Sequence, residues 1–145
     1  MSIIIEFFTA PDDTAAAGIV DRGPTGAFGS LSCGNFDATE AVIEWESIFT
    51  GQSFETLVSA DEPRMVVDPD EGDGPLVFVA SGALQGALAD AAPARLAEVG
   101  ELWIAERAED GEVFDPEMVG ELLGDLADLA RTARERGHSL YCWMA

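Results

Sequence analysis

The chain has 145 residues, of which 28 are acidic and seven are basic, so its formal net charge at pH 7 is −21. A surface with this charge repels phosphate backbones and anionic lipid headgroups, which argues against direct binding to nucleic acid or to a membrane. The length fits a single domain, residues 1–145, that is large enough to enclose one hydrophobic core.

The sign of the charge allows two interpretations. All seven basic residues are arginine, and the chain contains no lysine. This usage is typical of GC-rich genomes, and an acid excess is also common in salt-adapted proteins, so the charge can be a background bias. Alternatively, the acidic surface attracts a basic partner, because complementary charge speeds association. The sequence leaves both interpretations, and the oligomeric state, open.

We do not expect the N-terminal residues MSIIIEFFTAPDD to be a secretory signal, because no basic region precedes the apolar run and acids follow it at once. The apolar runs are all shorter than the ~18 residues that a membrane-spanning helix needs. Two cysteines, Cys33 and Cys142, are too few for a disulfide scaffold, so we expect a cytoplasmic location and buried free thiols. A Cys33–Cys142 disulfide remains an alternative if their two strands are neighbours.

Hydrophobic spacing and turn residues predict strands and helices in the following order along the chain. We expect strands at 2–8, 27–33, 64–68, 75–80 and 138–145, and helices at 11–22, 36–51, 54–58, 82–91, 93–107 and 115–136. The first and last strands are the most apolar, so we place them near the centre of one small mixed sheet packed against several helices. The expected fold class is α+β.

The helix predicted at 36–51 has clear signals at both ends. Asp37 is a capping residue and Glu40 follows three positions later, which makes an aspartate variant of the capping box. Gly51 supplies the stop. The apolar residues expected on its inner face are Ala41, Trp45, Ile48 and Phe49.

The segment DPDEGDG, residues 68–74, lies between two predicted strands and is rich in carboxylates. An EF-hand calcium loop needs ligands at its positions 1, 3, 5 and 12, with a glutamate at position 12. Counted from Asp68, position 5 is a glycine and position 12 is Val79. Counted from Asp70, position 12 is Ser81. Both registers fail, so we interpret the segment as an acidic turn rather than a metal site.

The tryptophans are expected to be core residues rather than a ligand cage. In the helix predicted at 93–107, Trp103 shares the inner face with Leu96 and Val99. Trp45 and Trp143 likewise fall on predicted inner faces.

The helix predicted at 115–136 has the strongest pattern, with Asp115 at its start and Gly137 at its end. Its expected apolar face consists of Met118, Leu122, Leu126, Leu129 and Ala133. Gly120 and Gly124 lie within it, at a cost of ~1 kcal/mol each relative to alanine. We expect close packing of these glycines against the core, with contact to a partner's helix as the alternative.

The same helix carries an acidic stripe made of Glu117, Glu121, Asp125 and Asp128. Their spacing puts them on one side of the helix, where like charges repel. Arginines near the C-terminus partly offset this repulsion, and Asp128 can pair with Arg131. The stripe is either a solvated helix face or a docking surface for a basic partner.

Residues for nucleophilic, metal or nucleotide chemistry are scarce. The single histidine, His138, follows a helix stop, where it can hydrogen-bond the last carbonyls or interact with the helix dipole. On a shared strand, His138 and Cys142 would be about 13 Å apart, too far for a Cys–His pair. The chain lacks a nucleophile elbow, a dinucleotide fingerprint and a P-loop lysine, and it has too few Cys and His for zinc. We therefore expect no catalytic residue, cofactor or metal ion.

Two segments resemble the YfbM-like family of small uncharacterised bacterial proteins. Residues 45–51, WESIFTG, are similar to that family's tryptophan-containing helix with its Thr-Gly stop. Residues 111–145 are similar to its closing long helix, its basic residue and glycine stop, and its apolar C-terminal strand. The resemblance implies a small α+β domain without catalytic residues, and loosely an immunity-type protein that neutralises a toxin.

These observations favour an interaction module that docks a more basic protein near the helix at 115–136, in the manner of an immunity or inhibitor protein. The alternative is a small-molecule-binding protein or an enzyme that uses carboxylates in a cleft. An interaction module should lack a deep pocket, whereas an enzyme should have a concave site with convergent carboxylates of raised pKa.

Overall fold

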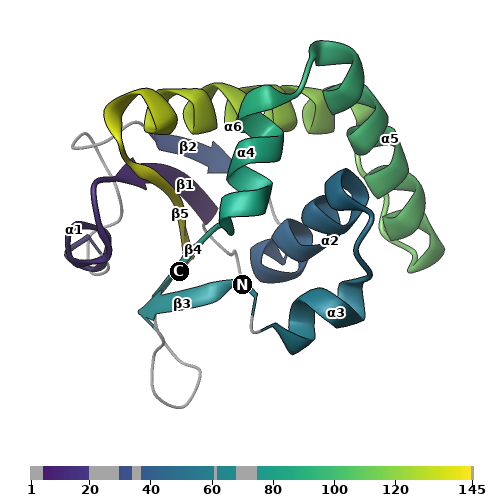
Figure 1. The fold of residues 1–145 in the computed structure, drawn as a ribbon. Helices are drawn as coiled ribbons and strands as arrows, with labels where there is room; N and C mark the ends of the chain where they lie inside the picture. Colours follow the sequence, from purple (N-terminus) through teal and green to yellow (C-terminus); the bar gives the residue numbers. More distant parts are fainter. Residues whose placement is uncertain (1–4, 20–29, 34–36, 61, 68–74, 145) are drawn as a thin grey trace.

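The structure is a computed structural model that describes residues 5–19, 30–33, 37–60, 62–67 and 75–144, without the side chains of residues 30–33 (Figure 1). Its strands are β1 (Ile5–Ala10), β2 (Ser30–Cys33), β3 (Arg64–Val67), β4 (Leu76–Val79) and β5 (Ser139–Met144). Its helices are α1 (Asp13–Ala17), α2 (Ala38–Thr50), α3 (Phe54–Ser59), α4 (Gly82–Asp90), α5 (Pro93–Glu109) and α6 (Pro116–Arg136). Each expected element is present, although α1 is shorter than the helix expected at 11–22. No helix among the described residues is both long and apolar enough to cross a membrane.

The five described strands form one sheet in the order β2-β1-β5-β4-β3. The last strand is central and the first is its neighbour, so the expected placement of both end strands is confirmed, as is the α+β class. Every described pairing is antiparallel, whereas the sequence predicts a mixed sheet. Strands β1 and β5 are apolar because both of their faces are buried. Such burial occurs in parallel and in antiparallel strands, so an apolar run does not predict the strand direction.

The strand register sorts side chains onto two faces of the sheet. Phe7 lies opposite Cys142 on the face that joins the main core, beneath α2, α4, α5 and α6. Phe8 lies opposite Tyr141 on the other face, where both belong to a smaller apolar cluster with Ala16 of α1. Figure 1 shows α1 apart from the other helices. The main core therefore lies between the sheet and helices α2, α4, α5 and α6, and Leu57 of α3 also contributes to it.

Capping residues explain where the helices begin and end. The residues whose side chains accept hydrogen bonds from first-turn backbone N–H groups are Asp12, Asp37, Ser53, Ser81 and Asp115. Helices α2 and α6 end at Gly51 and Gly137, which adopt φ values of 79° and 68°. Glycine takes this left-handed conformation without steric strain, so both predicted stops are confirmed.

The inner face of α6 is broader than expected. Its buried residues are Val119, Leu122, Leu123, Leu126, Ala127, Ala130 and Ala133. Two residues that were expected on this face are not fully buried. Met118 is 39% exposed, and Leu129 is only partly buried. The helix packs against α4 and α5 as well as the sheet, so its apolar stripe spans several neighbours rather than one seam.

The glycines of α6 do not pack against the core, so that expectation is wrong. A Cβ atom built on Gly120 or Gly124 would meet no described atom within 4 Å outside its own helix. The close approach occurs at Gly100 of α5, where a Cβ would lie 3.3 Å from Val119 Cγ1 and 3.4 Å from Leu123 Cδ1. Gly100 therefore lets α5 and α6 pack closely, and contact of Gly120 and Gly124 with a partner's helix stays a prediction.

The cysteines lie on strands that are not neighbours. Strand β1 separates β2, which contains Cys33, from β5, which contains Cys142. The condition for a Cys33–Cys142 disulfide is therefore not met, and Cys142 is buried, as expected. Trp45, Trp103 and Trp143 are all buried, which confirms them as core residues.

Candidate functional site

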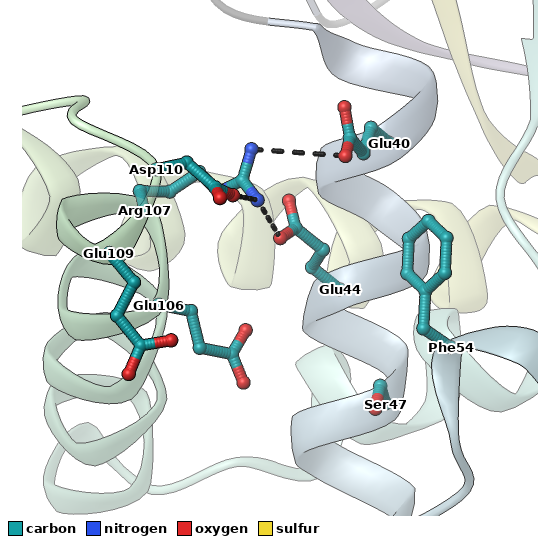
Figure 2. Close-up of a pocket in the computed structure, with 8 residues that line it drawn as sticks. All are labelled: Glu40, Glu44, Ser47, Phe54, Glu106, Arg107, Glu109 and Asp110. Carbon is teal, nitrogen blue, oxygen red and sulfur yellow. Dashed lines mark hydrogen bonds and ion pairs between the residues drawn. The ribbon is translucent and has the colours of Figure 1, made fainter.

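An open hollow of about 390 Å³ lies between α2 and the end of α5, next to the start of α3 (Figure 2). Its lining residues are Glu40, Glu44, Ser47, Phe54, Glu106, Arg107, Glu109 and Asp110. We call this site the acidic hollow.

Helical periodicity brings the lining residues of each helix together. Glu40, Glu44 and Ser47 follow one another at spacings of four and three, which puts them on one side of α2. The last turn of α5 contributes Glu106 and Arg107 from the opposite wall. Helices α2 and α5 pack against each other, so the two sets face the same space.

Arg107 joins the two walls through ion pairs. Its guanidinium lies 2.7 Å from an Asp110 carboxylate oxygen and 3.0 Å from Oε2 of Glu44. It also lies 3.4 Å from Glu112 and 3.8 Å from Glu40. Only 13% of the Arg107 side chain is exposed, so solvent screens these pairs less than it screens pairs on an open surface.

Glu44 lies at the back of the hollow and is 7% exposed. Its Oε1 accepts a hydrogen bond of 3.2 Å from the Trp103 indole nitrogen, while its Oε2 pairs with Arg107. Burial raises the pKa of Glu44, and the contacts with Trp103 and Arg107 oppose this rise. Both oxygens thus have protein partners, so Glu44 attaches the hollow to the core rather than offering a free acid or base.

The remaining wall combines exposed carboxyl groups with an aromatic ring. Partial burial raises the pKa of Glu106, and the nearby charge of Arg107 opposes the rise. Phe54, the first residue of α3, is 38% exposed and lines the hollow. An aromatic face of this kind attracts a cation placed over it.

The charge of the acidic hollow decides what it can bind. Five carboxyl groups and one guanidinium line it, so the local field favours cations and disfavours anions. The concave shape and the raised pKa values of Glu44 and Glu106 also match the pattern expected of a carboxylate-using cleft. The open shape and the engaged oxygens of Glu44 fit the binding of a guanidinium or ammonium group better than acid–base chemistry.

The acidic stripe lies elsewhere on the molecule. Its residues Glu117, Glu121, Asp125 and Asp128 are all exposed on one side of α6, and none of them lines the acidic hollow. The predicted pair between Asp128 and Arg131 is present at 2.8 Å. Arg131 also donates hydrogen bonds to the carbonyls of Ala89 and Ala91, each at 3.0 Å, and so connects α6 to the end of α4.

The remaining predictions concern the acidic turn, metal-binding groups, His138 and Cys142. The acidic turn at residues 68–74 lies outside the described residues. Within the described parts of the chain, no group of three or more His, Cys, Asp or Glu side chains could hold a metal ion. The backbone N–H of His138 donates to the carbonyl of Ala133 at 2.7 Å, while contact of its side chain with the last carbonyls or the helix dipole stays a prediction. Cys142 is fully buried and is inaccessible as a nucleophile.

The sequence contains a signal for the acidic hollow that the pattern analysis missed. Glu44 falls between Ala41 and Ile48 at helical spacing, on the apolar face of α2. A carboxylate on such a face requires a buried partner. Its partners, Trp103 and Arg107, lie on another helix, four residues apart, and only the tertiary structure identifies them.

Comparisons with protein-family models, with curated proteins and with solved structures find no match to this chain. The resemblance to the YfbM-like family therefore stays a prediction, and the functional argument rests on the geometry of the site.

Proposed function

We propose that this chain binds a basic protein, and that the acidic hollow receives an arginine or lysine side chain of that partner. The observation that carries the proposal is the set of five carboxyl groups around an open hollow with an exposed aromatic ring. The net charge of −21 would steer a basic protein towards the surface, and the hollow would supply the close contacts. Such binding suits an immunity-like or inhibitor-like role in the cytoplasm.

The acidic stripe on α6 is the competing docking surface. Its four carboxylates are exposed, and Gly120 and Gly124 leave open space on the outer side of the same helix. The stripe lies on a convex helix surface, so a partner's cation there stays hydrated and gains less than in a hollow. We therefore place the main contact at the acidic hollow and a supporting contact at the stripe.

A small-molecule-binding protein or a carboxylate-using enzyme is the second candidate. The raised pKa values of Glu44 and Glu106 in one hollow favour it. In that case the acidic hollow would bind a small organic cation, and the stripe would have no effect on binding.

The first experiment identifies the partner. The protein is immobilised and exposed to lysate of its native cell at low salt, and bound proteins are released by a salt step and identified by mass spectrometry. We expect one stoichiometric basic protein whose affinity falls as NaCl rises from about 50 mM to about 500 mM. An empty column would contradict the proposal and favour the second candidate.

A pair of matched variants then tests the site. The hollow variant is Glu40→Gln, Glu106→Gln and Glu109→Gln, and the stripe variant is Glu121→Gln, Asp125→Asn and Asp128→Asn. Each removes three negative charges, so the overall field changes equally. Titration calorimetry with the purified partner should show about tenfold or greater weakening for the hollow variant, because three charge contacts of at least roughly 0.5 kcal/mol each are lost.

The two variants separate the possible outcomes. A larger loss for the stripe variant would move the docking surface to α6. Equal losses would mean that only the overall charge matters, which would contradict a specific site at the acidic hollow.

A further inference from the structure

A second pair of carboxyl groups lies on the other side of α2, away from the acidic hollow. Glu46 of α2 and Glu62, which precedes β3, line one small cleft together with Ser81 at the start of α4. The cleft therefore lies where three segments of the fold meet, and two like charges face it.

Glu46 is held firmly in this cleft. It is 5% exposed, and its Oε1 accepts a hydrogen bond from the hydroxyl of Ser81. The same hydroxyl oxygen accepts the backbone N–H of Leu84 at 3.0 Å, so it caps α4 while it binds α2. A buried carboxylate tied to a helix cap has little freedom to move away from a neighbouring charge.

Glu62 is the more weakly held partner. Its backbone N–H donates to the carbonyl of Leu57 at 3.2 Å. Burial raises the pKa of its carboxyl group, the charge of Glu46 raises it further, and Arg64 opposes the rise. The guanidinium of Arg64 pairs with Asp13 at 2.7 Å, which reduces what it offers to Glu62.

Among the described residues, two charged groups act on Glu62, namely Glu46 and Arg64. Glu46 acts from α2 and Arg64 from β3, while α4 contributes the uncharged Ser81. Two carboxyl groups that face one desolvated cleft repel when both are ionised, and a proton on Glu62 removes this repulsion.

We propose that Glu46 and Glu62 form a pH-sensitive latch, in which a proton on Glu62 holds the segment before β3 against α2 and α4, and loss of that proton loosens the contact. This device is independent of the binding function proposed above. It would make the attachment of β3, an edge strand of the sheet, depend on pH.

The direction of the effect follows from proton linkage. The folded protein binds the Glu62 proton more tightly than the unfolded chain, whose reference pKa is 4.5. The latch therefore stabilises the fold fully below pH 4.5, and this contribution is lost as pH rises through the higher pKa of the folded state.

Carbon-13 NMR of the side-chain carboxyl groups tests the pairing directly. The titration of Glu62 is followed in the wild-type protein and in Glu46→Gln, which keeps an oxygen acceptor for Ser81 but removes the charge. We expect the Glu62 midpoint to fall by about half a pH unit or more in the variant. An unchanged midpoint would overturn the proposal.

A second measurement covers the case in which Glu46→Gln fails to fold. Urea midpoints are compared between about pH 4.5 and about pH 7.5 for wild type, Glu62→Gln and Glu101→Gln, where the last variant removes an exposed charge on α5. We expect the fall in midpoint with pH to be smaller in Glu62→Gln than in the other two proteins, and hydrogen-exchange protection of β3 to become less dependent on pH. Parallel pH profiles for all three proteins would contradict the latch.

Discussion

Asp13 connects three distant parts of the fold through one carboxylate. Arg64 of β3 donates to both of its oxygens, at 2.7 and 3.2 Å, and the hydroxyl of Tyr141 in β5 donates at 2.8 Å. The hydrogen bond from Arg64 and then that from Tyr141 lower the pKa of Asp13. Because Asp13 begins α1, these bonds attach that short helix to the sheet.

Tyr141→Phe should therefore destabilise the protein by ~1 kcal/mol at neutral pH, since a hydrogen bond to a carboxylate is lost and the partner remains partly hydrated. Urea unfolding measures this difference. The lowered pKa of Asp13 means that its contribution is present above its usual value of 3.8 and is lost as pH falls through the folded-state value. The loss of stability in Tyr141→Phe should therefore be smaller below pH 3.8 than at neutral pH. An equal loss under the two conditions would contradict this assignment.

Glu44 allows a second test at the scale of one residue. In Glu44→Gln the amide oxygen still accepts from Trp103, and the desolvated charge is removed, so we expect a change in unfolding free energy of less than about 1 kcal/mol. In Glu44→Ala the indole N–H of Trp103 loses this acceptor, which should cost ~2–3 kcal/mol. Chemical denaturation of both variants at neutral pH compares them, and similar losses for the two would show that charge, not hydrogen bonding, holds the residue.

At the scale of elements, the α5–α6 contact depends on one glycine. Gly100 is the point where α6 side chains approach the α5 backbone, whereas Gly120 and Gly124 face open space. All three are glycines inside predicted helices, and residue type alone does not distinguish a packing glycine from an exposed one. The neighbouring helix makes the difference.

Gly124→Ala should stabilise the protein by up to ~1 kcal/mol, because alanine has the higher helix propensity and its Cβ meets no described atom outside the helix. Gly100→Leu, in contrast, should destabilise it by roughly 1–3 kcal/mol through overpacking against Val119 and Leu123. Thermal unfolding of the two variants tests whether the melting temperature rises in Gly124→Ala and falls in Gly100→Leu. A loss of stability in Gly124→Ala would mean that α6 lies closer to another segment than the structure shows.

At the scale of the whole molecule, the net charge of −21 acts on every conformation that brings the acids together. Repulsion among them opposes the compact state, and added salt screens it. The melting temperature should therefore rise between about 10 mM and about 500 mM NaCl. The stripe variant, with three fewer negative charges, should show a smaller rise, and a melting temperature independent of salt would contradict this account.

Helix and strand positions were predictable because their signals are local. Asp37 and Gly51 delimit α2, and Asp115 and Gly137 delimit α6, within one turn of the backbone groups that they satisfy. The inner face of α6 was only partly predictable, because Met118 has helical spacing appropriate to the core but is 39% exposed. Periodicity indicates that a helix has an apolar face, and the packing partners set its width.

The acidic stripe was predictable from the sequence, whereas the acidic hollow was not. The stripe lies on one helix, so spacing alone placed its four carboxylates on one side. The hollow needs Glu44 from α2 and Arg107 from α5, and no local pattern relates them. Its cation preference therefore became visible only when the two helices were placed side by side.

The sequence by itself determined the elements, the α+β class, the placement of the two end strands near the centre of the sheet, and the charge. Each of these follows from residue type and short-range spacing, which act within a few residues of the chain. The tertiary structure alone decided the strand order, the close approach at Gly100, the separation of Cys33 from Cys142 and the convergence of carboxyl groups on the acidic hollow. These features depend on contacts between segments far apart in sequence, and such contacts leave no periodic mark on either segment.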